Sequence, residues 1–113
     1  IERPGGGVVM LGSGGSNRIR TALAQVAARI VDGARQEDAV AAPRLHVESA
    51  EEIDFEDDFP EKERAALLRH RPEARPWSEP SMFFGGVHAV ARDPRGGVEA
   101  AGDPRRDGVA IVG

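Results

Sequence analysis

The chain has 113 residues, of which 40% are hydrophobic and 30% charged, and this composition predicts one modest soluble globular domain. The net charge of −4 argues against a nucleic-acid partner, because neutralising phosphates requires a basic face. The absence of cysteine excludes disulfides, zinc–thiolate sites and a cysteine nucleophile, and no apolar run is long enough to form a membrane segment.

The first third of the chain predicts a strand, a glycine-rich loop and a helix in immediate succession. Val8–Leu11 form an apolar run between turn residues, which favours a fully buried strand. The loop Gly12–Asn17 follows. Between Ile19 and Val31, apolar residues recur every three or four positions, which predicts an amphipathic helix. One of the last two loop residues, both of capping type, is expected to cap this helix, and Gly33 to close it.

The middle of the chain predicts short elements separated by prolines and charges. Pro43 is expected to end a short helix, and Pro60 suits the first turn of another. Three prolines between residues 72 and 80 enforce an irregular, extended stretch around Trp77. The expected elements are a helix over 36–42, strands over 44–48 and 51–55, a solvated turn at 56–58 and a lightly packed surface helix over 60–70.

The last third predicts antiparallel strands. Residues 86–92 alternate in part, and Asp93–Gly97 has the composition of a turn. Two further strands, over residues 98–101 and 109–112, are expected to complete a meander. This succession of helices and antiparallel strands predicts an α+β fold built in layers.

The loop Gly12–Asn17 is the first candidate for chemistry. A glycine-rich turn that leads from a strand into a helix exposes backbone N–H groups, which together with the helix dipole favour negative charge. The loop lacks the Gly-Lys-Ser/Thr of a P-loop, and Asn17 stands where a dinucleotide fingerprint has its third glycine. Two interpretations stay open: a site for a carboxylate or oxyanion, or a tight turn without a ligand.

The other polar groups are interpreted as structural. Asp103–Gly108 is expected to be a polar turn between two strands. The alternative is that its Asp and Arg side chains support a site by contacting the residues that form it. The acidic residues between 51 and 58 are expected to form a solvated face. His46, His70 and His88 lack metal-ligand spacing and are interpreted as surface or half-buried residues, so we expect no metal and no cofactor.

The sequence contains no recognisable nucleophile. Ser13 and Ser16 have no identifiable base, Thr21 lies inside the predicted helix, and the first residue is Ile1 rather than Thr, Ser or Cys. We therefore expect the chain to be inactive by itself.

Four segments of the chain carry distinctive motifs: Leu11–Ile19 (LGSGGSNRI), Glu37–His46 (EDAVAAPRLH), Phe84–Val90 (FGGVHAV) and Gly102–Arg106 (GDPRR). In the same order, they resemble segments of the γ-glutamyltransferases (γ-glutamyltranspeptidases). The resemblance implies part of the αββα sandwich of the N-terminal-nucleophile hydrolases, in which helices pack on antiparallel strands. It also implies that residues 1–113 are a single partial domain, the C-terminal part of the small subunit of a self-cleaving precursor.

The resemblance implies an enzyme that hydrolyses or transfers the γ-glutamyl group of glutathione-like amides through an acyl-enzyme. Its nucleophilic Thr would lie upstream, its partners would be the remainder of the small subunit and the large subunit, and its substrate a small γ-glutamyl molecule. In the family, two adjacent loop residues donate backbone N–H groups to the oxyanion and thereby bind substrate. Aligned without gaps, these are Gly15 and Ser16; with a deletion and an insertion, they are Gly14 and Gly15.

The sequence is also compatible with two other functions. A related acylase of the same fold, acting on glutaryl or poly-γ-glutamate substrates, is one alternative, and a non-catalytic anion-binding module is another. The best-known family members imply a periplasmic or secreted location, with a cytoplasmic one as the alternative.

Overall fold

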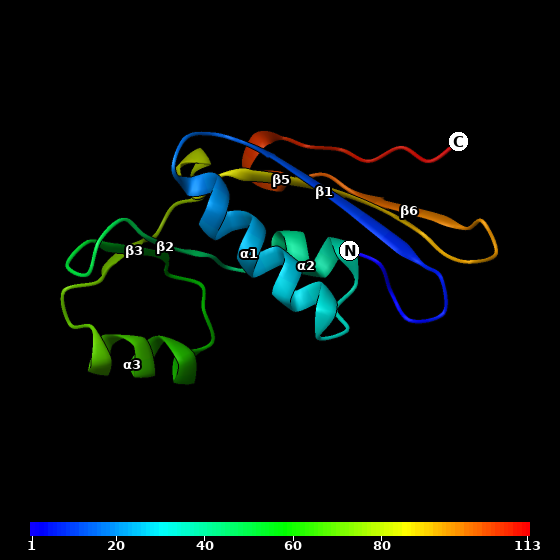
Figure 1. Ribbon diagram of the computed structural model, residues 1–113. Helices are drawn as coiled ribbons and strands as arrows, with labels where there is room; N and C mark the ends of the chain where they lie inside the picture. The colour runs from blue at the N-terminus through cyan, green and yellow to red at the C-terminus, as the bar shows by residue number, and fades with distance from the viewer.

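Two three-stranded sheets and three α-helices make up the computed structural model, which describes residues 1–113 (Figure 1). The molecule is elongated, with extents of 47 × 27 × 23 Å. The elements in chain order are β1 (Val8–Gly14), α1 (Arg18–Val31), α2 (Gln36–Ala41), β2 (Leu45–Val47), β3 (Ile53–Glu56), α3 (Glu61–His70), β4 (Arg75–Trp77), the 3₁₀ turn η1 (Met82–Phe84), β5 (Gly86–Arg92), β6 (Val98–Ala101) and the 3₁₀ turn η2 (Pro104–Arg106).

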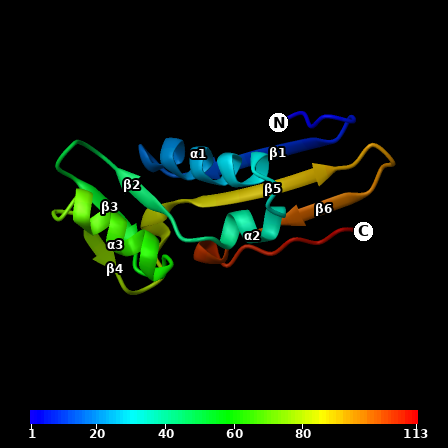
Figure 2. The same cartoon turned by 90° about the horizontal axis from the view of Figure 1, so that it is seen from below.

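The larger sheet has the strand order β1-β5-β6, and all its pairs are antiparallel. Strands β1 and β5 pair along their whole length, from Val8 opposite Arg92 to Gly14 opposite Gly86. Helices α1 and α2 both cover the same face of this sheet (Figures 1 and 2). The main core lies between them, and it consists of Val9, Ala22, Val26, Ile30, Ala39, Val40, Val87, Ala89, Ala91 and Ala101.

The smaller sheet has the order β2-β3-β4 and includes one parallel pair, between β3 and β4. The stretch around Trp77 is extended, as predicted, but the expectation that it is irregular is wrong at β4, which pairs with β3. Pro76 is compatible with this strand because β4 lies at a sheet edge. Helix α3 packs lightly, as predicted: none of its residues is buried, and Leu67 and Leu68 rest against Ile53 and Phe55.

The face of the larger sheet that points away from the helices carries exposed apolar side chains. Val9 is 1% exposed, whereas its neighbour Met10 is 68% exposed, because successive side chains of a strand point to opposite faces. The prediction of a fully buried first strand is therefore wrong. A shallow hollow on this face is lined by Val8, Met10, Val90, Arg92 and Val98.

Helix α1 ends as its sequence predicts but does not begin so. Gly33 adopts a φ of 102°, and the amide of Ala34 donates to the carbonyl of Arg29 at 2.9 Å, which closes the helix. At the start, Asn17 takes the capping position without capping. Its side-chain amide donates instead to Glu48 Oε1 at 3.2 Å, on the connection after β2.

The predicted final strand over residues 109–112 is absent. After η2, Asp107 adopts a left-handed conformation, with a φ of 50°, and Gly108 donates to the Asp103 carbonyl at 2.9 Å. The chain then continues without a strand partner, with Val109 and Ile111 exposed. The β5–β6 hairpin and the α+β prediction as a whole are confirmed.

Candidate functional site

The glycine loop is shorter than its sequence suggests, because β1 continues through Gly12 to Gly14. Gly15 then turns the chain with a φ of 126°, which other residues rarely adopt. The amides of Gly15 and Ser16 donate no hydrogen bond within the chain, and both residues are exposed. Two free N–H donors therefore lie just before α1, where the helix dipole also favours an anion.

Arg106 lies beside this loop. Its Nη2 donates to the carbonyl oxygen of Gly14 at 3.2 Å, although the two residues are 92 positions apart in the sequence. A Cβ atom placed on Gly14 or on Gly15 would lie 3.7 Å from the guanidinium nitrogens. The structure thus places a cation in direct contact with the loop that carries the free amides.

A buried ion pair fixes the turn that carries Arg106. Asp103 and Arg44 are both fully buried, and Asp103 Oδ2 lies 2.7 Å from Arg44 Nη2. The same oxygen accepts the amide of Val87 at 2.8 Å, and Oδ1 accepts the amide of Arg105 at 2.9 Å. Burial alone raises the pKa of Asp103, but these amides and Arg44 outweigh it and hold the pKa below its usual range.

Arg105 and Glu56 form the second part of this network. Arg105 Nε donates to Glu56 Oε2 at 2.9 Å, and its Nη groups donate to the carbonyls of Val40 and Ala42, both at 3.0 Å. Burial lowers the pKa of Arg105, but Glu56 and Asp103 outweigh this effect and raise it above its ordinary value. The expectation of a solvated turn is wrong at Glu56, which is 7% exposed.

The interpretation of Asp103–Gly108 as a polar turn between strands is therefore correct only in part. The segment does form a turn, but no strand follows it, and its Asp103 and Arg105 side chains lie inside the protein. Charged groups enter the interior only when they are paired. Sequence spacing gave no sign of the pairing, because the partners Arg44 and Glu56 lie far away in the chain.

His46 is buried, which corrects its interpretation as a surface or half-buried residue. Its Nδ1 lies 2.8 Å from Thr21 Oγ1 and its Nε2 lies 2.8 Å from Glu48 Oε2. The bond to His46, followed by that to Asn17, lowers the pKa of Glu48. Thr21 Oγ1 also lies 3.1 Å from the carbonyl of Arg18, in its own helix. This chain of polar groups joins α1 to β2, and we assign it no nucleophilic role.

The acidic stretch is only partly a solvated face. Glu51, Glu52 and Asp58 are exposed as expected, whereas Asp54 is 3% exposed. Asp54 accepts hydrogen bonds from Arg75, at 2.8 and 3.0 Å, and from the indole of Trp77 at 2.9 Å. The remaining histidines, 70 and 88, are exposed, and no group of three or more His, Asp or Glu residues is placed to hold a metal ion.

An aromatic wall lies next to the first residue of α1. The guanidinium of Arg18 sits 4.7 Å from the ring centre of Phe83, and Phe83 stacks on Trp77 at 4.6 Å. Phe84 meets both rings edge-on and is buried. This wall was not predicted from the sequence, although three of the five aromatic residues fall between positions 77 and 84.

Comparison with known families decides what this arrangement belongs to. The family model described as gamma-glutamyltranspeptidase matches the chain over residues 1–113. The chain belongs to the γ-glutamyltranspeptidase family. The resemblance seen in the glycine loop and the three other segments is thereby confirmed. Among curated proteins, none matches the chain.

Solved structures agree with this family. CapD, a transpeptidase of Bacillus anthracis, superposes with a TM-score of 0.81 at 25% identity, over 100% of this chain and 68% of the CapD chain. The γ-glutamyltranspeptidase of Pseudomonas nitroreducens complexed with L-DON gives 0.77 at 26% identity, over 99% of this chain and 58% of that one. The cephalosporin acylase of Bacillus halodurans gives 0.76 at 28% identity, over 91% and 20%.

These likenesses confirm the N-terminal-nucleophile hydrolase fold. The chain spans about two thirds of the CapD chain, 58% of the P. nitroreducens chain and one fifth of the acylase. None of the helices is long and apolar enough to cross a membrane.

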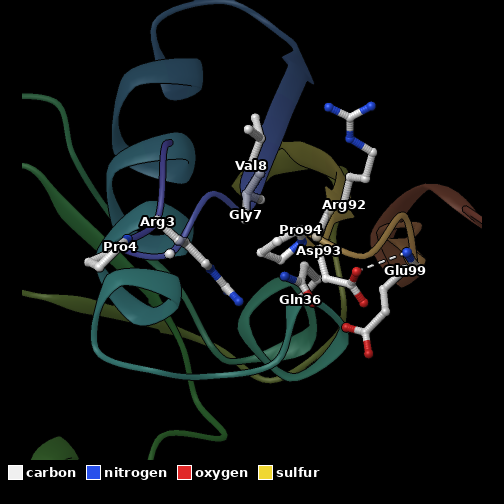
Figure 3. A pocket seen from close by; sticks show the side chains of 13 residues that line it. Arg3, Pro4, Gly7, Val8, Gln36, Arg92, Asp93, Pro94 and Glu99 are labelled. Carbon is white, nitrogen blue, oxygen red and sulfur yellow. Dashed lines mark hydrogen bonds between the residues drawn. The ribbon is translucent and has the colours of Figure 1, made fainter.

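A cavity of about 280 Å³ lies at the opposite end of β1 from the glycine loop (Figure 3). Arg3, Gln36 and Glu99 line it. With its amide oxygen towards Arg3 and its nitrogen towards Glu99, Gln36 makes hydrogen bonds of 3.2 and 2.7 Å. The buried amide of Gln36 is therefore satisfied by side chains of the same chain, whereas the amides of Gly15 and Ser16 in the glycine loop have no partner.

Proposed function

We propose that this chain is the C-terminal part of the small subunit of a γ-glutamyltransferase and that its glycine loop forms the oxyanion site. The observation that carries the proposal is the pair of free amides at Gly15 and Ser16, before α1, in a chain of this family. Backbone donors that are fixed in advance stabilise the charge that develops in the transition state of acyl transfer.

In the proposed reaction, this chain supplies the donors to the oxyanion, and a residue outside it supplies the nucleophile. A Thr outside these residues attacks the γ-glutamyl amide, and the carbonyl oxygen becomes an anion in the tetrahedral intermediate. Gly15 donates to this anion in both possible alignments of the loop, together with either Ser16 or Gly14. Loss of one such donor typically costs about 10²–10³-fold in rate.

Two observations support the status of the chain as part of a larger enzyme. The chain spans 58% of the P. nitroreducens chain. The outer face of the β1-β5-β6 sheet also exposes Met10, Val90 and Val98, which is the kind of surface that a second sheet covers in a layered fold. We propose that the remainder of the small subunit covers this face and that the large subunit completes the enzyme.

A related acylase is the second candidate. The observation that favours it is the likeness to the cephalosporin acylase of B. halodurans, at 28% identity over 91% of this chain. The two candidates share the oxyanion chemistry and differ in the acyl group, which the transferase recognises through the α-amino and α-carboxylate groups of glutamate.

The test compares γ-glutamyl-p-nitroanilide with glutaryl-p-nitroanilide as substrates of the full-length protein. We expect turnover of the γ-glutamyl compound and faster release of nitroaniline when a dipeptide acceptor is added. Preference for the glutaryl compound would favour the acylase. The isolated 113-residue chain, assayed in parallel, is expected to hydrolyse neither. An isolated chain that binds carboxylates while the full-length protein turns over nothing would support a non-catalytic module.

A further inference from the structure

The position of Arg106 against the glycine loop has a consequence for the oxyanion donors. Gly14 and Gly15 share one peptide group: the carbonyl oxygen belongs to Gly14 and the N–H belongs to Gly15. Arg106 Nη2 donates to that carbonyl oxygen at 3.2 Å, while the N–H on the other side of the same peptide is free. The guanidinium therefore acts on the one donor that both alignments of the loop have in common.

We propose that Arg106 is a positioning residue that orients and polarises the Gly14–Gly15 peptide, so that the Gly15 amide is a stronger donor to the oxyanion. This inference rests on the proposed function. A hydrogen bond from a charged donor is stronger than one between neutral groups, and hydrogen bonds in a chain polarise one another. Withdrawal of electron density at the carbonyl oxygen leaves the N–H of the same peptide more positive.

The surrounding structure holds Arg106 for this contact. Its stem crosses directly over Gly86, where a Cβ atom would lie 2.2 Å from Arg106 Cδ. Its turn is anchored by Asp103, whose Oδ1 accepts the amide of Arg105 and whose carbonyl accepts the amide of Arg106 at 3.1 Å. Arg105 points inward to Glu56, where it stabilises the fold. Arg106, the next residue, points outward and contacts the Gly14 carbonyl of the loop.

The experiment uses the full-length enzyme with Arg106→Met, Arg106→Lys and, as a matched control, Arg95→Met in the exposed β5–β6 turn. Each protein is checked for self-cleavage, and its folding is checked by circular dichroism. For each, kcat and KM are measured with γ-glutamyl-p-nitroanilide. Inhibition constants are measured for glutamate and for a boronic-acid analogue of the γ-glutamyl group, which forms a tetrahedral anion with the nucleophile.

For Arg106→Met we expect kcat to fall about 10-fold with KM nearly unchanged, a smaller loss than removal of a whole donor. Binding of the boronate should weaken by a similar factor, because it resembles the transition state, while binding of glutamate stays the same. Arg106→Lys, which keeps the charge, should lie between Met and wild type, and it carries the test if Arg106→Met does not fold. Arg95→Met should match wild type.

Three results would overturn the inference. A raised KM with unchanged kcat would mean that Arg106 binds substrate directly. Equal loss of boronate and glutamate binding would mean a general structural role, and wild-type kinetics in Arg106→Met would mean no role in the reaction. If wild type itself turns over no γ-glutamyl substrate, the proposed function fails and this inference fails with it.

Discussion

Arg44 and Asp103 form an ion pair at 2.7 Å in which neither side chain is exposed to solvent. Arg44 follows α2 and Asp103 directly precedes η2, so the pair ties the covering helices to the turn that carries Arg106. Arg44 also donates to the carbonyls of Val40 and Phe84, at 2.8 and 3.1 Å. The pair therefore holds in place the turn from which Arg106 contacts the glycine loop.

Removal of the Asp103 charge should therefore be costly. In Asp103→Asn, Arg44 remains buried without its counter-ion, and breaking a buried pair in this way typically costs about 3–5 kcal/mol. Urea unfolding of the full-length enzyme measures the loss. Asp107→Asn is the matched control, because Asp107 is exposed in the same turn and Asn tolerates its left-handed backbone. Equal stability of the two variants would rule out a supporting role for the pair.

Asp103 should also make the stability depend on pH. Its folded pKa lies below its usual value, so the native state favours the carboxylate. The stability that it contributes is complete above its unfolded pKa of about 3.9 and is lost as pH falls through the lower folded pKa. Below about pH 4, the Tm of wild type should fall more steeply with decreasing pH than that of Asp103→Asn. Parallel curves would show that Asp103 does not cause the dependence.

Gly86→Ala tests the position of Arg106 without changing any charge. The new methyl group would occupy the space of the Arg106 stem, which is flexible and can move aside. We expect the chain to fold and kcat to fall about as much as in Arg106→Met, roughly 10-fold. The double variant should lose no more than either single one, because both remove the same contact. Additive losses would separate Gly86 from Arg106.

Met10→Lys tests the exposed face of the larger sheet. If another layer covers this face in the full-length enzyme, the lysine charge is buried there without a partner, which costs several kcal/mol. The Tm should decrease. Ala28→Lys, on the exposed side of α1, should leave the Tm nearly unchanged. A normal Tm in Met10→Lys would mean that the face stays open to solvent.

The sequence predicted the parts of the fold that depend on local pattern. Apolar periodicity located α1, and Gly33 predicted its end because few other residues adopt a φ of 102°. The glycine content of residues 12–17 indicated the turn before α1, although β1 extends to Gly14 and only the end of this segment turns. The order of helices and strands then led to an α+β fold, and the four collinear segments led to the family.

What the sequence did not predict depends on contacts between distant segments. In the sequence, Glu56 and Asp103 have the pattern of solvated charges. In the folded chain, Glu56 pairs with Arg105 and Asp103 pairs with Arg44. The contact between Arg106 and Gly14 has no local signature at all. Met10 was expected in the core because it lies in a continuous apolar run. Such a run does not show which face of the sheet is covered, and Met10 lies on the open face.

A crystal structure of the full-length enzyme with the boronate adduct tests the central claim most directly. We expect one boronate oxygen about 2.7–3.1 Å from the amide nitrogens of Gly15 and of either Ser16 or Gly14. We also expect Arg106 to contact the Gly14 carbonyl in the adduct. A boronate oxygen held by other groups, with the Gly15 amide out of reach, would contradict the assignment of this loop as the oxyanion site.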